Sequence, residues 1–304
     1  MSIEAGIAPS PPLASNIAKE LQTCGYSVIR GAASPELIRS IERDLAPAFE
    51  TAPFCRGGFY GERTKRFGRL LLRSALTERL VLHAEILAAA EEILRPWCDT
   101  IQLNLTQGLS LHPGALQQFP HRDQDMWQGV KGEVEYLVNV MWPFTPYERA
   151  NGATLIWPGS HGAAALAAET GDHPLAIELA PGDALVFLGS TLHGAGANRS
   201  TTTRRGMIVS YCLGWLKPYE NQWLAYPPAI ARRFGSELAA LVGYRQHRPN
   251  LGNYEGLCPS VLLGPHPPSL PGATDALRGE QSDALNSWMA SQHAARGSGQ
   301  EGVS

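Results

Sequence analysis

Residues 118–127 read Gln-Phe-Pro-His-Arg-Asp-Gln-Asp-Met-Trp, and this stretch contains a His-x-Asp pair, His121 and Asp123. In an extended strand, side chains two residues apart point to the same face. One imidazole and one carboxylate would then project side by side and supply two ligands of a metal site. The spacing occurs often by chance, so its meaning depends on whether the chain supplies a third ligand and a pocket.

A second histidine follows a buried strand later in the chain. Gly182 and Asp183 belong to a turn, residues 184–188 form an apolar segment, and His193 comes shortly after its end. Catalytic side chains are often placed just past the ends of rigid strands. With His121 and Asp123, this histidine completes the 2-His-1-carboxylate set that is typical of non-haem Fe(II) oxygenases.

Two successive arginines, Arg204 and Arg205, precede the apolar segment 207–213. An arginine inside a β-barrel can hold a carboxylate through two parallel hydrogen bonds. Neighbouring residues on a strand face opposite ways, so only one of the two can enter the pocket. We expect Arg204 to do so, and Arg205 is the alternative.

The composition narrows the class of protein. The chain has 304 residues, 44% of them hydrophobic, and a net charge of −3, so no attraction to nucleic acid or to an anionic membrane is expected. Its five cysteines include no Cys-x-x-Cys pair, which disfavours a zinc ribbon or a disulfide framework. The chain shows neither a signal peptide nor an apolar run of about 18 residues. We therefore predict a cytoplasmic protein with reduced thiols and no membrane span.

The order of patterns indicates a mainly β domain flanked by α-helices. Helical spacing appears at 13–24, at 34–49, at 74–95 and at 229–242, and a short strand is expected at 26–29. Ser34 is the expected N-cap of the second helix, and Pro35 is its first residue. From residue 100 onward, short apolar segments alternate with turn residues, which is typical of a sandwich or barrel. These segments are 101–105, 115–119, 133–142, 154–157, 176–179, 184–188 and 207–213. We predict a flexible leader at 1–12, a single domain at 13–296 and a disordered tail at 297–304.

Residues 53–69 differ from their surroundings. They combine glycines, two aromatic residues and several basic residues, among them Tyr60 and Arg66. Such a segment is either a solvated loop or a mobile lid over a pocket that receives an anionic substrate. Both interpretations stay open at this point.

The spaced set of His121, Asp123, His193 and Arg204 resembles the phytanoyl-CoA dioxygenase family of Fe(II)- and 2-oxoglutarate-dependent oxygenases. The resemblance runs from about residue 13 to 261. It includes the segments 151–154 (Asn-Gly-Ala-Thr), 158–161 (Pro-Gly-Ser-His) and 211–215 (Tyr-Cys-Leu-Gly-Trp). It implies a double-stranded β-helix, the cupin-like jelly roll.

The resemblance also implies the chemistry. Iron would be held by His121, Asp123 and His193, and 2-oxoglutarate and O2 would take the remaining positions. Arg204 would pair with the distal carboxylate of 2-oxoglutarate, and Thr154 and Gln118 match positions that contact this cosubstrate. An unactivated C–H bond would be oxidised, most simply by hydroxylation, with release of succinate and CO2. Related halogenases have a small residue where this chain has Asp123, so halogenation is disfavoured.

Several aromatic and polar residues remain as further candidates. Tyr60, Arg66, Trp127, Tyr211 and Trp215 are candidate substrate contacts, although core packing also explains the last three. His112, His161 and Asp125 are interpreted as turn or surface residues that could support the metal ligands. The expected substrate is a small, partly apolar molecule with a polar or anionic end, such as a specialised metabolite.

Two other functions are compatible with these patterns. One is a jelly-roll binding protein without catalytic activity, and the other is a cupin-type dioxygenase that does not use 2-oxoglutarate. Formation of succinate distinguishes both from the main hypothesis. The expected partner is a small molecule, and a homodimer is the commonest assembly for such a chain.

Overall fold

The computed structural model describes residues 13–167, 173–265 and 272–298, and contacts divide the chain into two compact units, Met1–Pro227 and Pro228–Ser304. The first unit contains α1 (Leu13–Cys24), β1 (Tyr26–Ile29), α2 (Pro35–Thr51), β2 (Thr64–Phe67), α3 (Leu70–Arg73), α4 (Thr77–Val81), α5 (Ala84–Leu94), η1 (Arg95–Trp97), β3 (Ile101–Leu111), η2 (Asp123–Met126), β4 (Leu137–Pro143), β5 (Thr154–Ile156), α6 (Gly162–Ala167), β6 (Leu175–Ile177), β7 (Ala184–Leu188), β8 (His193–Ala195), β9 (Arg204–Leu213) and α7 (Gln222–Ala225). The second contains α8 (Pro228–Ala231), α9 (Ser236–Leu241), η3 (Pro259–Leu263) and α10 (Gly279–Ser298).

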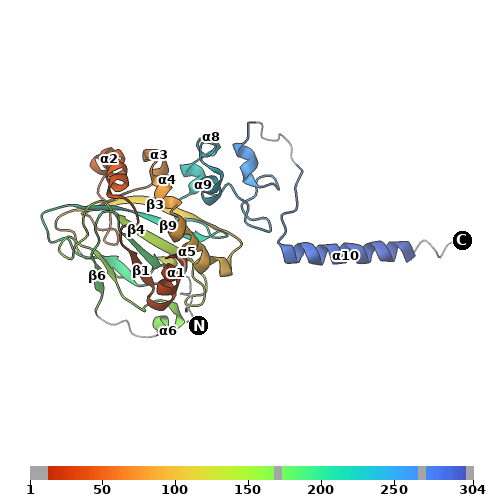
Figure 1. The fold of residues 1–304 in the computed structure, drawn as a ribbon, viewed down its shortest axis with the longest axis horizontal. Coiled ribbons are helices and arrows are strands. Elements are labelled where there is room, and N and C mark those ends of the chain that lie inside the picture. Colours follow the sequence, from red (N-terminus) through yellow and green to blue (C-terminus); the bar gives the residue numbers. More distant parts are fainter. Residues whose placement is uncertain (1–12, 168–172, 266–271, 299–304) are drawn as a thin grey trace, which may run out of the picture. The chain divides into compact units, whose positions relative to one another are not determined.

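Two antiparallel sheets form the first unit (Figure 1). The larger has six strands in the order β1-β7-β4-β9-β3-β2, and the smaller has the order β6-β5-β8. The long pair β3 and β9 runs from Ile101 opposite Leu213 to Leu111 opposite Arg204, with an irregularity between Leu103 and Leu105. This register brings the start of β9 to the same sheet end as the last residues of β3.

The core lies between the sheets. One buried cluster combines Leu109, Met141 and Phe187 of the larger sheet with Ile156 and Ile177 of the smaller one. Two antiparallel sheets that enclose one apolar core form a jelly roll. The predicted mainly β architecture is therefore confirmed.

Helices cover the outside of the larger sheet (Figure 1). Helix α1 buries Ile17, Ala18 and Leu21 and packs against α5, which also contacts β4. Helix α2 begins as its sequence predicts: the hydroxyl of Ser34 accepts a hydrogen bond from the backbone N–H of Leu37, and Pro35 follows the cap. The other side of the jelly roll, which contains a cavity, is formed by strands and loops.

The predicted secondary structure needs several corrections. Residues 115–119 form no strand, because Leu116 and Phe119 are exposed and only single hydrogen bonds join this segment to its neighbours. The helix predicted at 74–95 is interrupted around His83, whose backbone is extended, and that predicted at 229–242 is interrupted at Gly235. The glycine-rich loop contains strand β2.

The chain ends also differ from expectation. Helix α10 was not predicted, and it extends through Ser298 into the segment expected to be disordered. The predicted leader at 1–12 and the rest of the tail lie outside the described residues. The single domain expected at 13–296 stays a prediction.

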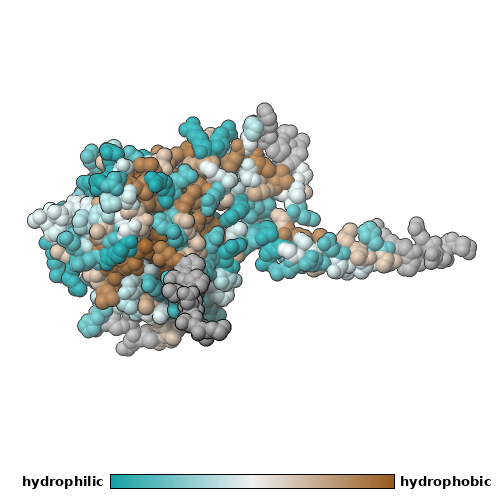
Figure 2. All heavy atoms as spheres, in the orientation of Figure 1, coloured by the Kyte–Doolittle hydropathy of each residue, from teal (hydrophilic) through white to brown (hydrophobic). Residues whose placement is uncertain are grey.

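Surface character agrees with the modest net charge. Polar and apolar residues are mixed over the visible face of the first unit (Figure 2). Among the described residues, no helix has both the length and the apolar character of a membrane span.

Candidate active site

His121 and His193 are brought together by a backbone bridge. The N–H of each donates to the carbonyl of the other at 3.0 Å, and the centroids of their rings are 4.4 Å apart. Arg122 is extended, so Asp123, the first residue of η2, points to the same side as His121. The Asp123 carboxylate lies 3.5 Å from Nε2 of His121 and 3.6 Å from Nε2 of His193. The structure thus unites the three side chains that the sequence predicts as metal ligands, with their ligand atoms all within 4.8 Å of one another.

The hydrogen bonds of the two rings set their protonation. Nδ1 of His121 is 2.8 Å from the carbonyl oxygen of Phe119, and Nδ1 of His193 is 3.0 Å from that of Thr191. A carbonyl only accepts, so each Nδ1 carries a proton, and in the neutral form of the ring Nε2 then has the lone pair. Both lone pairs belong to the atoms nearest Asp123, which is the arrangement a metal ion requires.

The charges of the Asp123 and His193 side chains also suit the binding of a cation. Burial alone would raise the pKa of Asp123, but His193 and His121 outweigh it and lower this pKa to about 2. Burial lowers the pKa of His193 despite the nearby carboxylate. A metal binds the ionised carboxylate and the neutral imidazole, so these directions favour a loaded site near neutral pH. Two neutral nitrogen donors and one carboxylate suit Fe(II).

Two phenylalanines border the metal-ligand cluster. The ring of Phe187 on β7 lies 4.7 Å from that of His193, and the ring of Phe59 lies 4.9 Å from that of His121. Phe59 belongs to the 53–69 loop. Neither residue carries a sequence motif that marks it as part of a site; the one signal for Phe59 is its place in the unusual glycine-rich stretch.

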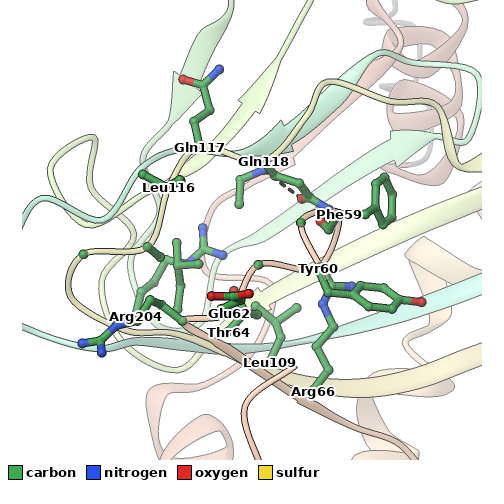
Figure 3. A pocket seen from close by; sticks show the side chains of 17 residues that line it. Phe59, Tyr60, Glu62, Thr64, Arg66, Leu109, Leu116, Gln117, Gln118 and Arg204 are labelled. Carbon is green, nitrogen blue, oxygen red and sulfur yellow. Dashed lines mark hydrogen bonds between the residues drawn. The ribbon is translucent and has the colours of Figure 1, made fainter. Parts of the chain in front are cut away.

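A cavity of about 440 Å³ lies beside Phe59, whose ring contacts that of His121. Figure 3 shows the residues that line it, and the three metal-ligand candidates are not among them. Its walls come from residues 58–64, from β2 and β3, from residues 114–118, and from Ala195 and Arg204. Gln117 and Gln118 lie across it from Leu109 (Figure 3). Gln118 precedes His121 by three residues and Ala195 follows His193 by two, so the chain that carries the ligands also forms the wall.

Of the two successive arginines, Arg204 lines this cavity, together with Arg63 and Arg66. Its side chain is buried, with the residue 2% exposed, one terminal nitrogen donates to the carbonyl of Gly152, and the guanidinium lies 4.3 Å from the ring centroid of Tyr147. Its Nε has no partner among the described residues. Arg205 instead lies 3.5 Å from Glu42 and over the ring of Phe49.

Four other candidates lie in or beside the cavity. Gln118 accepts a hydrogen bond from the N–H of Ala195 at 3.2 Å and donates to the carbonyl of Phe59 at 3.4 Å. Thr154 is buried on β5 opposite Ala195. Arg66 lines the cavity, lies 5.0 Å over the ring of Tyr60 and donates to Gln107.

The three remaining aromatic candidates do not line this cavity. Tyr211 is fully buried and its hydroxyl donates to the carbonyl of Val81 at 2.6 Å, which argues against the predicted substrate contact. The indoles of Trp127 and Trp215 donate to the carbonyls of Lys217 and Trp97. These indole contacts instead join neighbouring segments of the chain.

The other polar candidates also lie away from the metal-ligand cluster. His161 contacts the carbonyl of Gln22, and His112 contacts Ser110 and Thr203. Asp125 faces Lys131 at 3.5 Å. Their structural interpretation, as turn and surface residues, is the one that these contacts support.

The comparison with protein families is decisive. The family model "Phytanoyl-CoA dioxygenase (PhyH)" matches residues 21–206, well over half of the chain. The chain belongs to the phytanoyl-CoA dioxygenase family.

Curated relatives agree with this assignment. "Dioxygenase cdmD" of Talaromyces verruculosus is 30% identical over 260 residues, which cover 76% of this chain and 84% of that protein. "Multifunctional dioxygenase prhA" of Penicillium brasilianum is 27% identical and covers 78% and 85%. The chain is therefore a dioxygenase, as predicted.

Solved structures show the same fold. The α-ketoglutarate-dependent epimerase SnoN, in a complex with Fe3+, α-ketoglutarate and nogalamycin RO, has a TM-score of 0.54 and 19% identity, and covers 66% of this chain and 84% of its own. HygX from Streptomyces hygroscopicus, with nickel and 2-oxoglutarate bound, has a TM-score of 0.51 and 15% identity, and covers 67% and 89%. The double-stranded β-helix is confirmed, and the expected Fe(II) and 2-oxoglutarate agree with the family and with the donor set of the site.

Proposed function

We propose that this dioxygenase hydroxylates an unactivated C–H bond of a small, partly apolar metabolite and converts 2-oxoglutarate to succinate and CO2. The observation that carries the proposal is the His121, Asp123 and His193 cluster beside a cavity that contains one buried arginine. Iron, when bound, supplies the activation of O2. The chain's own residues orient the two organic molecules and exclude water.

Each residue has a role in the proposal. His121, Asp123 and His193 hold the metal, with both Nδ1 protons kept on backbone carbonyls. Arg204 binds the distal carboxylate of 2-oxoglutarate, because it is a buried cation whose Nε is free of partners among the described residues. Gln118 and Thr154 flank Ala195 and contact the same cosubstrate.

The cavity and its rim support the substrate class. The cavity is lined by the apolar Leu109 and Leu111 of β3 and by the cationic Arg66 of β2, which suits an apolar body with an anionic end. Near the mouth, Phe59 is 50%, Leu116 86% and Phe119 72% exposed. Apolar groups left in water at a rim favour an apolar ligand that covers them. The named complexes of SnoN and HygX with nogalamycin RO and hygromycin B are in keeping with a specialised metabolite.

The 53–69 loop acts as a lid in this proposal. Its Phe59 covers His121, and the hydroxyl of its Tyr60 lies 2.7 Å from that of Tyr219. Gly57 and Gly61 have positive φ values of 91° and 82°, which glycine adopts at little cost, so the loop can change course on either side of the two aromatic residues. A lid of this kind excludes water once the substrate has entered.

Two measurements test the function. Anaerobic addition of Fe(II) and 2-oxoglutarate should give the weak visible charge-transfer band of the chelate. His193→Ala should abolish this band, whereas His161→Ala, whose ring contacts Gln22 instead, should keep it. A screen of metabolites for substrate-stimulated succinate release, followed by mass spectrometry, then identifies the substrate. A chelate band without any succinate would indicate a binding protein, and oxidation without succinate a dioxygenase of the cupin type.

A further inference from the structure

Asn139 lies behind the carboxylate of the metal-ligand cluster. It is in the middle of β4, opposite Phe187 on one side and Ser210 on the other, and it is 1% exposed. Its Nδ2 donates to Oδ2 of Asp123 at 2.9 Å. This buried asparagine therefore has a role beyond packing if its amide fixes the orientation of the Asp123 carboxylate.

The orientation of the amide follows from the charge of Asp123. An ionised carboxylate only accepts hydrogen bonds, so the NH2 group of Asn139 must face it and the amide oxygen must face away. That oxygen is buried without a partner among the described residues. Leaving a buried carbonyl unpaired is costly, which indicates that the bond to Asp123 outweighs the loss.

The bond makes the two carboxylate oxygens of Asp123 unequal. Oδ2 accepts the hydrogen bond from Asn139 at 2.9 Å, whereas Oδ1 faces Nε2 of His121 at 3.5 Å. A carboxylate with two free oxygens can bind a metal through both of them, and would then occupy a position that the cosubstrate or O2 needs. A strong bond to one oxygen opposes this.

We propose that Asn139 is a positioning residue that holds Oδ2 of Asp123, so that Oδ1 alone is presented to the metal. The inference rests on the proposed iron site. It assigns the role to a residue that does not touch the metal, the cosubstrate or the substrate. Partners of metal ligands typically change metal affinity by about 10–100-fold when they are removed.

Ser210 offers a matched control. It is the Cα partner of Asn139 on β9, so both side chains project from the same face of the sheet, and it is equally buried. Its hydroxyl accepts from Asn104 at 3.2 Å and no bond joins it to Asp123. Ser210→Ala therefore removes a buried polar group at the same depth without changing the carboxylate.

The experiment compares wild type, Asn139→Leu and Ser210→Ala as full-length apoproteins. Free Mn(II) is measured by electron paramagnetic resonance during titration, and the visible band is recorded with Fe(II) and 2-oxoglutarate without O2. Leucine has the same branched heavy-atom skeleton as asparagine but no hydrogen-bonding group; if its larger volume prevents Asn139→Leu from folding, Asn139→Ser, which is too short to reach Asp123, takes its place. We expect about 10–100-fold weaker Mn(II) binding and a shifted or weakened band for the Asn139 variant, and neither change for Ser210→Ala.

The outcomes separate the inference from the function on which it rests. Mn(II) affinity within about twofold of wild type for the Asn139 variant overturns the positioning role. Equal losses in the Asn139 and Ser210 variants overturn it too, because they would reflect general damage to the sheet. If wild type itself shows no metal binding and no band, the iron site fails first.

Discussion

Arg204 and Arg205 show how one position along a strand separates a side chain that lines the cavity from one that faces helix α2. Arg204 is opposite Leu111, which lines the cavity, whereas Arg205 is opposite Ser110 and lies toward Glu42 on helix α2. The alternation of a strand requires opposite faces, and the register with β3 decides which face is which.

Arg204→Ala should weaken binding of 2-oxoglutarate while metal binding stays close to wild type. Truncating one partner of a buried charged pair costs about 2–5 kcal/mol, which is a loss of about thirtyfold or more in affinity. Titration of the Fe(II) protein with 2-oxoglutarate, followed by the visible band, measures it. Arg205→Ala is the control and should keep the affinity of wild type; the opposite pattern would move the cosubstrate contact to Arg205.

Glu135 gives a prediction about pH. Burial raises its pKa to about 7 although Ser190 donates two hydrogen bonds to it, at 3.2 and 2.5 Å. Between its ordinary pKa and about 7, the folded chain keeps a proton that the unfolded chain has lost. The free energy of unfolding therefore falls as pH rises through this window.

Glu135→Gln removes that proton exchange. The Tm of this variant relative to wild type should rise between about pH 5 and pH 8, as measured by differential scanning calorimetry. Glu133→Gln changes an exposed carboxylate nearby and should leave the Tm difference flat. A flat difference for Glu135→Gln as well would mean that Glu135 is ionised at little cost in the fold.

At the scale of elements, the 53–69 loop is part of the fold through strand β2 and also forms one wall of the cavity. Strand β2 pairs with β3 from Thr64 opposite Leu111 to Phe67 opposite Gly108, which anchors the end of the loop. Just before β2, Arg63 donates two hydrogen bonds to the carbonyl of Pro113 and accepts one from the N–H of His112. The tip of the loop is held by Phe59 and Tyr60, which contact His121, Gln118 and Tyr219. A firmly anchored end and a tip held by few side-chain contacts suit a lid.

Tyr219→Phe should loosen the lid. It removes the hydroxyl that lies 2.7 Å from that of Tyr60. A hydrogen bond of this kind contributes about 0.5–1.5 kcal/mol, so the open form should become about two- to tenfold more populated. Metal loss to an excess of chelator, followed by absorbance, should accelerate by that factor.

Tyr254→Phe is a suitable control, because it removes the hydroxyl of an exposed tyrosine outside the jelly roll. Its rate of metal loss should match wild type. An unchanged rate for Tyr219→Phe would indicate that the tyrosine pair does not hold the loop closed.

At the scale of the whole molecule, the metal and 2-oxoglutarate should stabilise the first unit because its folded state alone assembles the three ligands. Mn(II) at about 100 times its Kd adds about 2.7 kcal/mol, which corresponds to a rise in Tm of about 5–10 °C for a unit of this size. Thermal unfolding with and without Mn(II) measures the shift. His193→Ala should show little of it, and an equal rise in that variant would point to metal binding elsewhere.

The sequence by itself determined the class of fold and the three candidate metal ligands. Short apolar segments between turn residues specify buried strands, and His-x-Asp with a later histidine after a strand specifies donor types and local spacing. Helices α1 and α2 were predictable for the same reason, since their apolar spacing and the Ser34 cap are local features.

Only the tertiary structure decided the rest. The bond from Asn139 to Asp123, the position of Phe59 over His121 and the burial of Tyr211 each depend on residues brought together from distant segments. A sequence pattern shows which side of a strand is apolar, but not which distant partner its side chains meet. Strand register and sheet packing set that partner, and they arise from the whole core rather than from any one stretch.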